Sequence, residues 1–188
     1  MIFRLSKIRA VIFLFFPNII INYYYKCKYH ELESFKIGFS WLDVDKFEVR
    51  GNVKIGHLNF IKQKSLFLQN STIGFGNRIL GNFDTKLRGD LGNFNVIRNA
   101  NKNPTSLDTG EDSKITSNHY LDLCGNITLG KGALLAGRGT QIWTHSYGYF
   151  NSERFRIDAD VMIGENSYIG SRATLQSPLS IGNRVTLA

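Results

Sequence analysis

The sequence predicts an all-β fold in which short strands wind into a parallel β-helix. Two ladders of large apolar residues, each with a period of six, carry this prediction. One ladder consists of Ile157, Ile163, Ile169, Leu175, Ile181 and Leu187. The other consists of Val49, Ile55, Ile61, Phe67, Ile73 and Ile79. A helix repeats about every 3.6 residues and a flat strand every 2, so a period of six fits neither of them alone.

Glycine follows several of these apolar residues, as in Ile55-Gly56, Ile73-Gly74 and Ile163-Gly164. A coil of three short strands needs one inward aliphatic side chain per strand and a small residue where the chain bends. Successive coils then stack about 4.8 Å apart through ladder hydrogen bonds. No single coil buries its own apolar side chains, so the stability comes from stacking. The alternative, a β-sandwich, requires a period of two and irregular turns.

The composition indicates a single intracellular domain. At 188 residues the chain is long enough for one continuous core. Cys27 and Cys124 lie 97 positions apart and form no CxxC pair, which favours reduced thiols in the cytoplasm. The net charge of +8 is compatible with nucleic acid, but the basic residues are dispersed and no recognition motif accompanies them, so we expect no nucleic-acid partner. An anionic small substrate or an anionic membrane surface explains the charge equally well.

Residues 1–34 differ from the rest of the chain. They contain five cations and no acid before Glu31, and an apolar run over residues 10–16 is followed by Pro17. This run is too short for a membrane-spanning helix, and no small-residue cleavage site of a signal peptide follows it. Two interpretations stay open: an interfacial membrane anchor formed by residues 1–30, or a helix packed against the coils or a neighbouring subunit. The first would place the protein peripherally on the inner face of the membrane.

The β-helix domain is predicted over residues 35–188. Asp43 occupies a ladder position, so either one coil is irregular or the count slips there. Residues 81–98 continue the stack, whereas residues 99–114 are polar, aperiodic and rich in turn formers, and predict a loop that leaves it. The apolar residues then resume in two phases that differ by two positions, and the register stays open. These are Ile115, Leu121 and Ile127 in one phase, and Leu123, Leu129 and Leu135 in the other.

The ladder is interrupted between Leu135 and Ile157, and this interruption is the predicted site of the chemistry. Insertions in repeat folds lie at the surface and commonly carry function. The interruption contains His145 between Trp143 and Tyr147, whose rings are suited to line a pocket. An imidazole takes a proton from a hydroxyl near neutral pH, so His145 is the candidate catalytic residue.

The segment Gln141-Ile-Trp-Thr-His145, followed by the ladder over residues 163–172, resembles the hexapeptide-repeat acyltransferases of the left-handed β-helix superfamily. It is most similar to the O-acetyltransferases of sugar and polysaccharide biosynthesis. The segment Asn118-His-Tyr-Leu-Asp122 resembles the stretch that precedes the catalytic histidine in that family. The resemblance covers roughly residues 35–188. It implies a left-handed β-helix, a homotrimer with active sites between adjacent prisms, and direct acetyl transfer from acetyl-CoA to a hydroxyl of a sugar or glycan, without a metal.

The resemblance also implies roles for individual residues. His145 is the general base, and Asp122 is the candidate for orienting its other ring nitrogen. Residues on the acceptor side are Asn118, His119, Asp122, Trp143 and Tyr147. Residues on the acetyl-CoA side are Gly170, Ser171 and Arg172, where Ser171 matches a position that contacts the CoA arm in the family and Arg172 or Arg184 is available to its phosphates.

Two other functions stay open. Members of the family continue beyond the position where this chain stops, at Leu187-Ala188, so the sequence is expected to be a fragment or to have impaired donor binding. A non-catalytic scaffold or binding protein is therefore one alternative. A zinc enzyme resembling the γ-class carbonic anhydrases is the other, and it requires three converging histidines. The nearest two along the chain, His119 and His145, are 26 positions apart.

Overall fold

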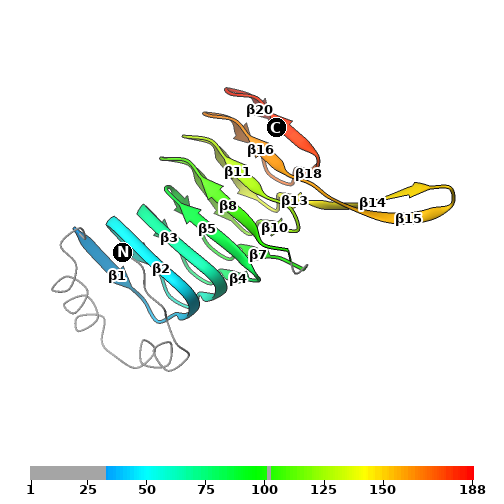
Figure 1. Cartoon of the computed structure of the whole chain (residues 1–188). Helices are drawn as coiled ribbons and strands as arrows, with labels where there is room; N and C mark the ends of the chain where they lie inside the picture. The colour runs from blue at the N-terminus through cyan, green and yellow to red at the C-terminus, as the bar shows by residue number, and fades with distance from the viewer. Residues whose placement is uncertain (1–32, 101–102) are drawn as a thin grey trace.

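The computed structural model of the chain describes residues 33–100 and 103–188. These residues form a parallel β-helix of about eight turns (Figure 1), which confirms the predicted fold class. No helix occurs in the described part of the chain. The helical or apolar segment predicted for residues 1–34 lies, up to residue 32, outside the described residues.

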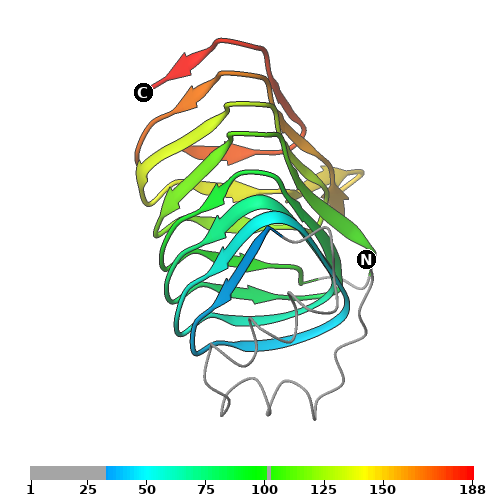
Figure 2. The same ribbon diagram turned by 90° about the vertical axis from the view of Figure 1, so that its left-hand side faces the viewer.

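Each turn contributes strands to three faces, here called A, B and C, and the view in Figure 2 shows the resulting triangular section. Strands β2 (Trp41–Ile55) and β3 (Phe60–Ile73) each run along all three faces. Face A holds β1 (Ser34–Ile37), β6 (Asp90–Leu91), β9 (Lys114–Ser117), β12 (Leu134–Arg138), β17 (Tyr168–Ile169) and β20 (Thr186–Leu187).

Face B follows face A along the chain, and face C follows face B. Face B holds β4 (Arg78–Leu80), β7 (Val96–Arg98), β10 (Tyr120–Asp122), β13 (Gln141–Trp143) and β18 (Thr174–Gln176). Face C holds β5 (Phe83–Leu87), β8 (Thr105–Thr109), β11 (Ile127–Leu129), β16 (Val161–Ile163) and β19 (Leu179–Ile181). Strands β14 (His145–Phe150) and β15 (Glu153–Asp158) form a separate antiparallel hairpin that projects from the prism (Figure 1).

The strand register explains the period of six. In regular coils the paired residues are 18 positions apart, as for Ile79 with Ile97 and Ile163 with Ile181. Three hexads therefore complete one turn. Asp43 pairs with Lys62, 19 positions later, and the offset returns to 18 at Val53. This confirms the slip that the sequence indicated around Asp43.

The inward residues of the three faces form one continuous core. Most ladder residues lie in it, including Ile55, Ile61 and Ile73. The placement of Phe67 was wrong: its ring is half-exposed, and Leu66 and Leu68 are buried instead. This coil has one residue fewer between faces B and C than the next coil, because Ile61 pairs with Ile79, 18 positions later, and Leu66 pairs with Thr85, 19 positions later. The placement of Ile157 was also wrong, since it lies on β15 of the hairpin and pairs with Ser146.

Both apolar phases between residues 115 and 135 are buried. In β11 the first and third residues, Ile127 and Leu129, point into the core on either side of the half-buried Thr128. A strand of three residues directs its first and third side chains to the same side. The two phases that the sequence left open therefore belong to one register.

The predicted continuation of the stack over residues 81–98 is confirmed by β5, β6 and β7. The predicted loop over residues 99–114 was too long. Thr105–Thr109 forms β8, which pairs with β5 on one side and β11 on the other, and β9 begins at Lys114. Four extra residues lie in the connection between β7 and β8, where Phe83 pairs with Thr105, 22 positions later, and two more lie before β9, where Leu91 pairs with Ile115, 24 positions later.

Buried polar side chains form a ladder along the corner between faces A and B. In each coil the side chain accepts a hydrogen bond from the backbone N–H of its counterpart in the next coil, with distances of 2.8–3.1 Å. This corner ladder leaves those buried backbone N–H groups paired. Its members are Ser40, Asn59, Asn77, Asn95, His119 and Thr140.

Candidate active site

His145 is the first residue of the hairpin and stands at the corner between faces B and C. Its Nδ1 lies 2.8 Å from Oδ2 of Asp122, and 23% of its side chain is exposed. Asp122 ends β10, which pairs directly with β13 just before His145. The stacking of these two coils therefore brings together two residues that are 23 positions apart in the sequence.

The Asp122 carboxylate is buried and accepts hydrogen bonds at both oxygens. Thr144 Oγ1 lies 3.2 Å from Oδ2, and Cys124 Sγ lies 3.4 Å from Oδ1. Burial raises the pKa of the Cys124 thiol, which keeps it protonated as a donor. Asp122 is thus held in place by the prism and is almost inaccessible to solvent.

These contacts indicate the tautomer of His145. An ionised carboxylate only accepts hydrogen bonds, so Nδ1 carries the proton and donates it to Asp122. The other nitrogen, Nε2, then carries the lone pair and has no hydrogen-bond partner within the part of the chain that the structure describes. A neutral histidine in this arrangement is competent to act as a general base.

Aromatic rings surround the imidazole. The ring centroids of Trp143 and Tyr147 lie 5.8 and 6.3 Å from that of His145, both in edge-on geometry. Tyr120 extends this surface, with its ring 4.8 Å from that of Trp143. Tyr120 was not among the predicted site residues, although residues 120 and 122 lie on the same side of one strand and that alternation places its side chain beside Asp122.

Three arginines stand around these rings. The guanidinium of Arg154 lies 4.9 Å from the Tyr147 ring centroid. Arg156 interacts electrostatically with Tyr147 and Cys124 and forms an ion pair with Asp158, with Nε 2.7 Å from Oδ1. Arg98 acts electrostatically on Tyr120, although burial dominates and raises the pKa of that phenol. The surroundings of His145 are therefore both aromatic and cationic.

Both insertions of the β-helix leave the prism at this same corner between faces B and C. The backbone at Ala100, in the connection between β7 and β8, hydrogen-bonds to the Cys124 thiol. The hairpin β14–β15 adds 14 residues two turns later, so that Ile127 pairs with Val161, 34 positions along the chain. Asp122 and Cys124 thus lie between the two inserted segments.

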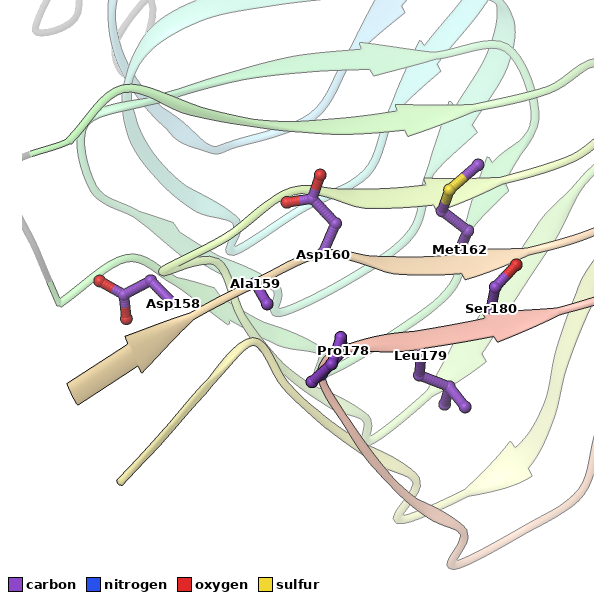
Figure 3. Close-up of a pocket in the computed structure, with 7 residues that line it drawn as sticks. All are labelled: Asp158, Ala159, Asp160, Met162, Pro178, Leu179 and Ser180. Atoms are coloured by element: carbon purple, nitrogen blue, oxygen red, sulfur yellow. The ribbon is translucent and has the colours of Figure 1, made fainter. Parts of the chain in front are cut away.

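A shallow cleft of about 540 Å³ opens beside the base of the hairpin. Figure 3 shows its lining, in which Asp158 and Asp160 stand at one end and Met162 and Ser180 lie on adjacent strands of face C. Asp158 is the register partner of His145 in the hairpin. The cleft and the imidazole therefore both lie at the base of the hairpin β14–β15.

Asn118 and His119, expected on the acceptor side, lie at the opposite corner of face B. Asn118 adopts a left-handed conformation there, with a φ of 57°, and its backbone continues the coil hydrogen bonds. His119 is buried in the corner ladder: Nδ1 accepts from the N–H of Thr140 at 3.1 Å, and Nε2 lies 2.9 Å from Thr116 Oγ1. Burial lowers the pKa of His119. Neither residue is brought to His145.

Gly170, Ser171 and Arg172, expected on the donor side, also lie at the corner between faces A and B. Ser171 Oγ accepts a hydrogen bond from the N–H of Arg138, and the N–H of Arg172 donates to the Arg138 carbonyl. The chain follows face B from Arg172 to Gln176, and these four residue-to-residue steps correspond to about 13 Å. Within one chain these residues are therefore a full face away from His145.

Asp122, Cys124 and His145 are the described residues whose ligand atoms come close enough together to hold a metal ion, all within 4.8 Å. The separation of 2.8 Å between Oδ2 and Nδ1 is that of a hydrogen bond. Two ligands of one tetrahedral zinc ion, at bond lengths near 2.0–2.1 Å, stand about 3.3 Å apart. The cluster fits a hydrogen-bond network better than a metal site.

The histidines do not converge in the described structure. His57 is exposed and lies with His119 at the corner between faces A and B, whereas His145 lies at the next corner. The three-histidine arrangement of a γ-class carbonic anhydrase is therefore absent from residues 33–100 and 103–188. His30 lies outside them.

Comparison with known proteins does not assign a function to this site, because no family model and no curated protein matches the chain. Among the described residues, no helix is both long and apolar enough to cross a membrane.

Proposed function

We propose that the protein is an O-acetyltransferase that uses acetyl-CoA to acetylate a hydroxyl of a sugar or glycan. The observation that carries this proposal is the Asp122–His145 pair, whose imidazole presents a free Nε2 beside aromatic rings at the corner of a β-helix. The resemblance of the segment that ends in His145 to sugar O-acetyltransferases supports the same assignment.

The geometry supports a direct transfer. Nε2 of His145 takes the proton of the acceptor hydroxyl while that oxygen attacks the thioester carbonyl carbon. The new C–O bond forms, the C–S bond breaks, and the imidazolium returns its proton to the departing CoA thiolate. Asp122 stabilises the transient imidazolium through its 2.8 Å contact with Nδ1 and fixes the orientation of the ring.

The surroundings of His145 suit a carbohydrate acceptor. The rings of Trp143, Tyr147 and Tyr120 offer apolar faces to the C–H groups of a sugar. Arg98, Arg154 and Arg156 offer hydrogen bonds and positive charge to an acidic sugar or to a phosphate of the donor. This combination favours a glycan acceptor over an apolar one.

We infer that the complete site requires a second copy of the chain. Gly170, Ser171 and Arg172 carry the expected donor contacts, yet they lie a full face away from His145 of the same chain. A homotrimer in which this corner of one prism meets the His145 corner of its neighbour would join the two halves. Since acetyl-CoA is a cytoplasmic metabolite, we place the protein in the cytoplasm. An interfacial anchor formed by residues 1–30 would hold it peripherally on the inner face of the membrane.

The alternative is a β-helix that binds a partner without catalysis. The position of the donor residues away from His145 favours it in the isolated chain. Acetyl-CoA binding measured by calorimetry, together with the oligomeric state measured by light scattering, distinguishes the two. A chain that remains monomeric and does not bind acetyl-CoA would support the scaffold.

The test of the proposal is CoA release from acetyl-CoA in the presence of candidate glycans. His145→Ala should lower the rate by a factor of about 10²–10⁴, the usual contribution of a general base. His57→Ala is the matched control, because it removes an exposed histidine from a different corner. Equal rates for His145→Ala and the wild type would refute the assignment.

A further inference from the structure

An apolar ridge runs along the corner between faces A and B in the first four coils. Four of its side chains occupy the corner itself and two start face B beside it. Phe39, Leu58, Phe60 and Phe94 are 42–57% exposed, and Phe75 is 37% exposed. The rings of Trp41 and Phe60 stack at 6.2 Å, and those of Phe75 and Phe94 meet edge-on at 5.2 Å. The apolar ridge is the set Phe39, Trp41, Leu58, Phe60, Phe75 and Phe94.

Two members of the ridge stand where the backbone disfavours them. Leu58 and Phe94 have φ values of 57° and 55°, a region that bulky side chains rarely adopt. Gly76 and Asn118 occupy the same corner position in neighbouring coils, and both residue types tolerate that conformation. Large apolar side chains at these positions cost stability and solubility, so their presence indicates a role other than folding.

Cations border the ridge on both sides. Lys36 and Lys54 are register partners on face A, directly before the corner, and Lys62 and Arg78 follow it on face B. All four are exposed, and none forms an ion pair with another described residue. Like charges on paired strand positions repel one another, and an anionic surface placed against the ridge would relieve that repulsion.

We propose that this ridge docks the folded β-helix on an anionic lipid bilayer. Aromatic and aliphatic side chains would enter the interfacial region of the bilayer while the flanking lysines and Arg78 meet the anionic headgroups. Three coil spacings separate the first and fourth coils, which gives a contact line about 14 Å long. A convex edge of this kind fits a deformable surface of headgroups rather than a pocket for a small ligand.

Charge selects the bilayer over a second copy of the same edge. Two copies meeting ridge to ridge would bring Lys36 and Lys54 of both chains together. The segment that precedes β1 has the same chemistry, because its apolar run at residues 10–16 lies among cations and no acid precedes Glu31. The apolar ridge and the segment that precedes β1 therefore both favour an anionic bilayer as the partner.

Docking through the ridge leaves the candidate active site free. The ridge ends with Phe94 in the fourth coil, whereas His145 lies at the next corner of the prism and two turns further along. Gly170, Ser171 and Arg172 share the corner of the ridge but lie three turns beyond Phe94. The proposal does not depend on acetyl transfer, since the ridge occupies other coils and has a different chemistry.

The experiment is co-sedimentation of the full chain with vesicles of phosphatidylcholine and phosphatidylglycerol at a 7:3 ratio, against phosphatidylcholine alone. The wild type should bind the anionic vesicles more tightly, and binding should weaken as salt is raised. The double variant Leu58→Asn, Phe94→Asn should lower the partition coefficient on the order of 30-fold, because two half-exposed apolar side chains no longer enter the bilayer. Lys36→Gln with Lys54→Gln should lower it about five-fold for each charge.

Asparagine is suited to the left-handed corner, so the double variant should fold at least as stably as the wild type, which thermal unfolding checks. Tyr168→Asn removes an aromatic side chain of similar exposure (41%) from a distant coil and should leave binding unchanged. Quenching of tryptophan fluorescence by brominated lipid should disappear in Trp41→Phe, leaving Trp143 unquenched. The proposal is overturned if the double variant binds vesicles like the wild type, or if it instead changes the oligomeric state in solution.

Discussion

Replacing His119 tests whether this residue belongs to the corner ladder. In the structure the ring is buried, Nδ1 accepts from the N–H of Thr140, and Nε2 lies 2.9 Å from Thr116 Oγ1. His119→Leu removes both partners and leaves a buried N–H unpaired. An unpaired buried group costs about 1–3 kcal/mol and the second hydrogen bond about 1 kcal/mol, so the free energy of unfolding should fall by about 2–4 kcal/mol.

His119→Asn is the matched variant. Asn95 and Asn77 occupy the same position in the preceding coils, where the amide oxygen accepts the N–H of the next coil. The same amide at residue 119 can accept from Thr140, so the loss should stay within about 1 kcal/mol. Urea denaturation at pH 7.5 measures the free energy of unfolding of both variants. In thermal unfolding, the midpoint temperatures of the two variants should differ by roughly 5–10 °C.

The wild type and His119→Asn also differ in the pH dependence of their stability. Burial lowers the pKa of His119 in the folded state, so the unfolded chain binds a proton more readily. The stability is fully present above the unfolded pKa, near 6.5, and is lost as the pH falls below it. The wild type should therefore lose more stability between pH 7 and 5 than His119→Asn does. Equal stability of the leucine variant and the wild type at pH 7.5, or equal damage by asparagine and leucine, would refute the ladder.

Three further predictions concern the site and the coils. Asp122→Asn should lower kcat/KM for acetyl transfer by 10–100-fold, since the imidazole loses the carboxylate that orients it; an unchanged kcat/KM would contradict the pairing. Tyr147→Ala should raise KM for the glycan more than it lowers kcat, whereas Tyr149→Ala, 73% exposed and further out on the hairpin, should change neither. Gly76→Ala should lower the unfolding free energy by about 1–2 kcal/mol, since φ is +68° and a Cβ would lie 2.7 Å from an aromatic ring. Gly182→Ala is its control, because the nearest atom lies 3.9 Å from that Cβ.

The period of six predicted the fold because each coil repeats the same local environment, and this repetition is visible in the sequence. The prediction failed where buried polar residues or an inserted segment replaced the apolar pattern. Thr105 and Thr109 point inward in β8 and are buried, so an apolar pattern could not reveal that strand. Ile157 follows the spacing of the ladder by coincidence, because the hairpin happens to place an isoleucine six positions before Ile163.

The candidate site could be predicted only in part. His145 stood out through its aromatic neighbours, and Asp122 through the resemblance of the preceding segment. The contact between them depends on the pairing of β10 with β13, which requires knowing the length of every intervening connection. Asn118 and His119 lie next to Asp122 in the sequence, yet β10 follows the whole of face B and separates them from it by its length. Residues that are close in the sequence therefore lie at different corners of the prism when a strand runs between them.

The pairing of Ile127 with Val161 across the hairpin has a consequence for how this protein can change over time. The prism closes in register on both sides of the inserted segment, and among the described residues the hairpin strands pair only with each other. Lengthening or exchanging that segment therefore costs little more than the entropy of a longer loop, which grows slowly with its length. If the proposed function holds, new acceptor specificities can arise in residues 146–157 while Asp122, Thr144 and the coils that hold them remain as they are.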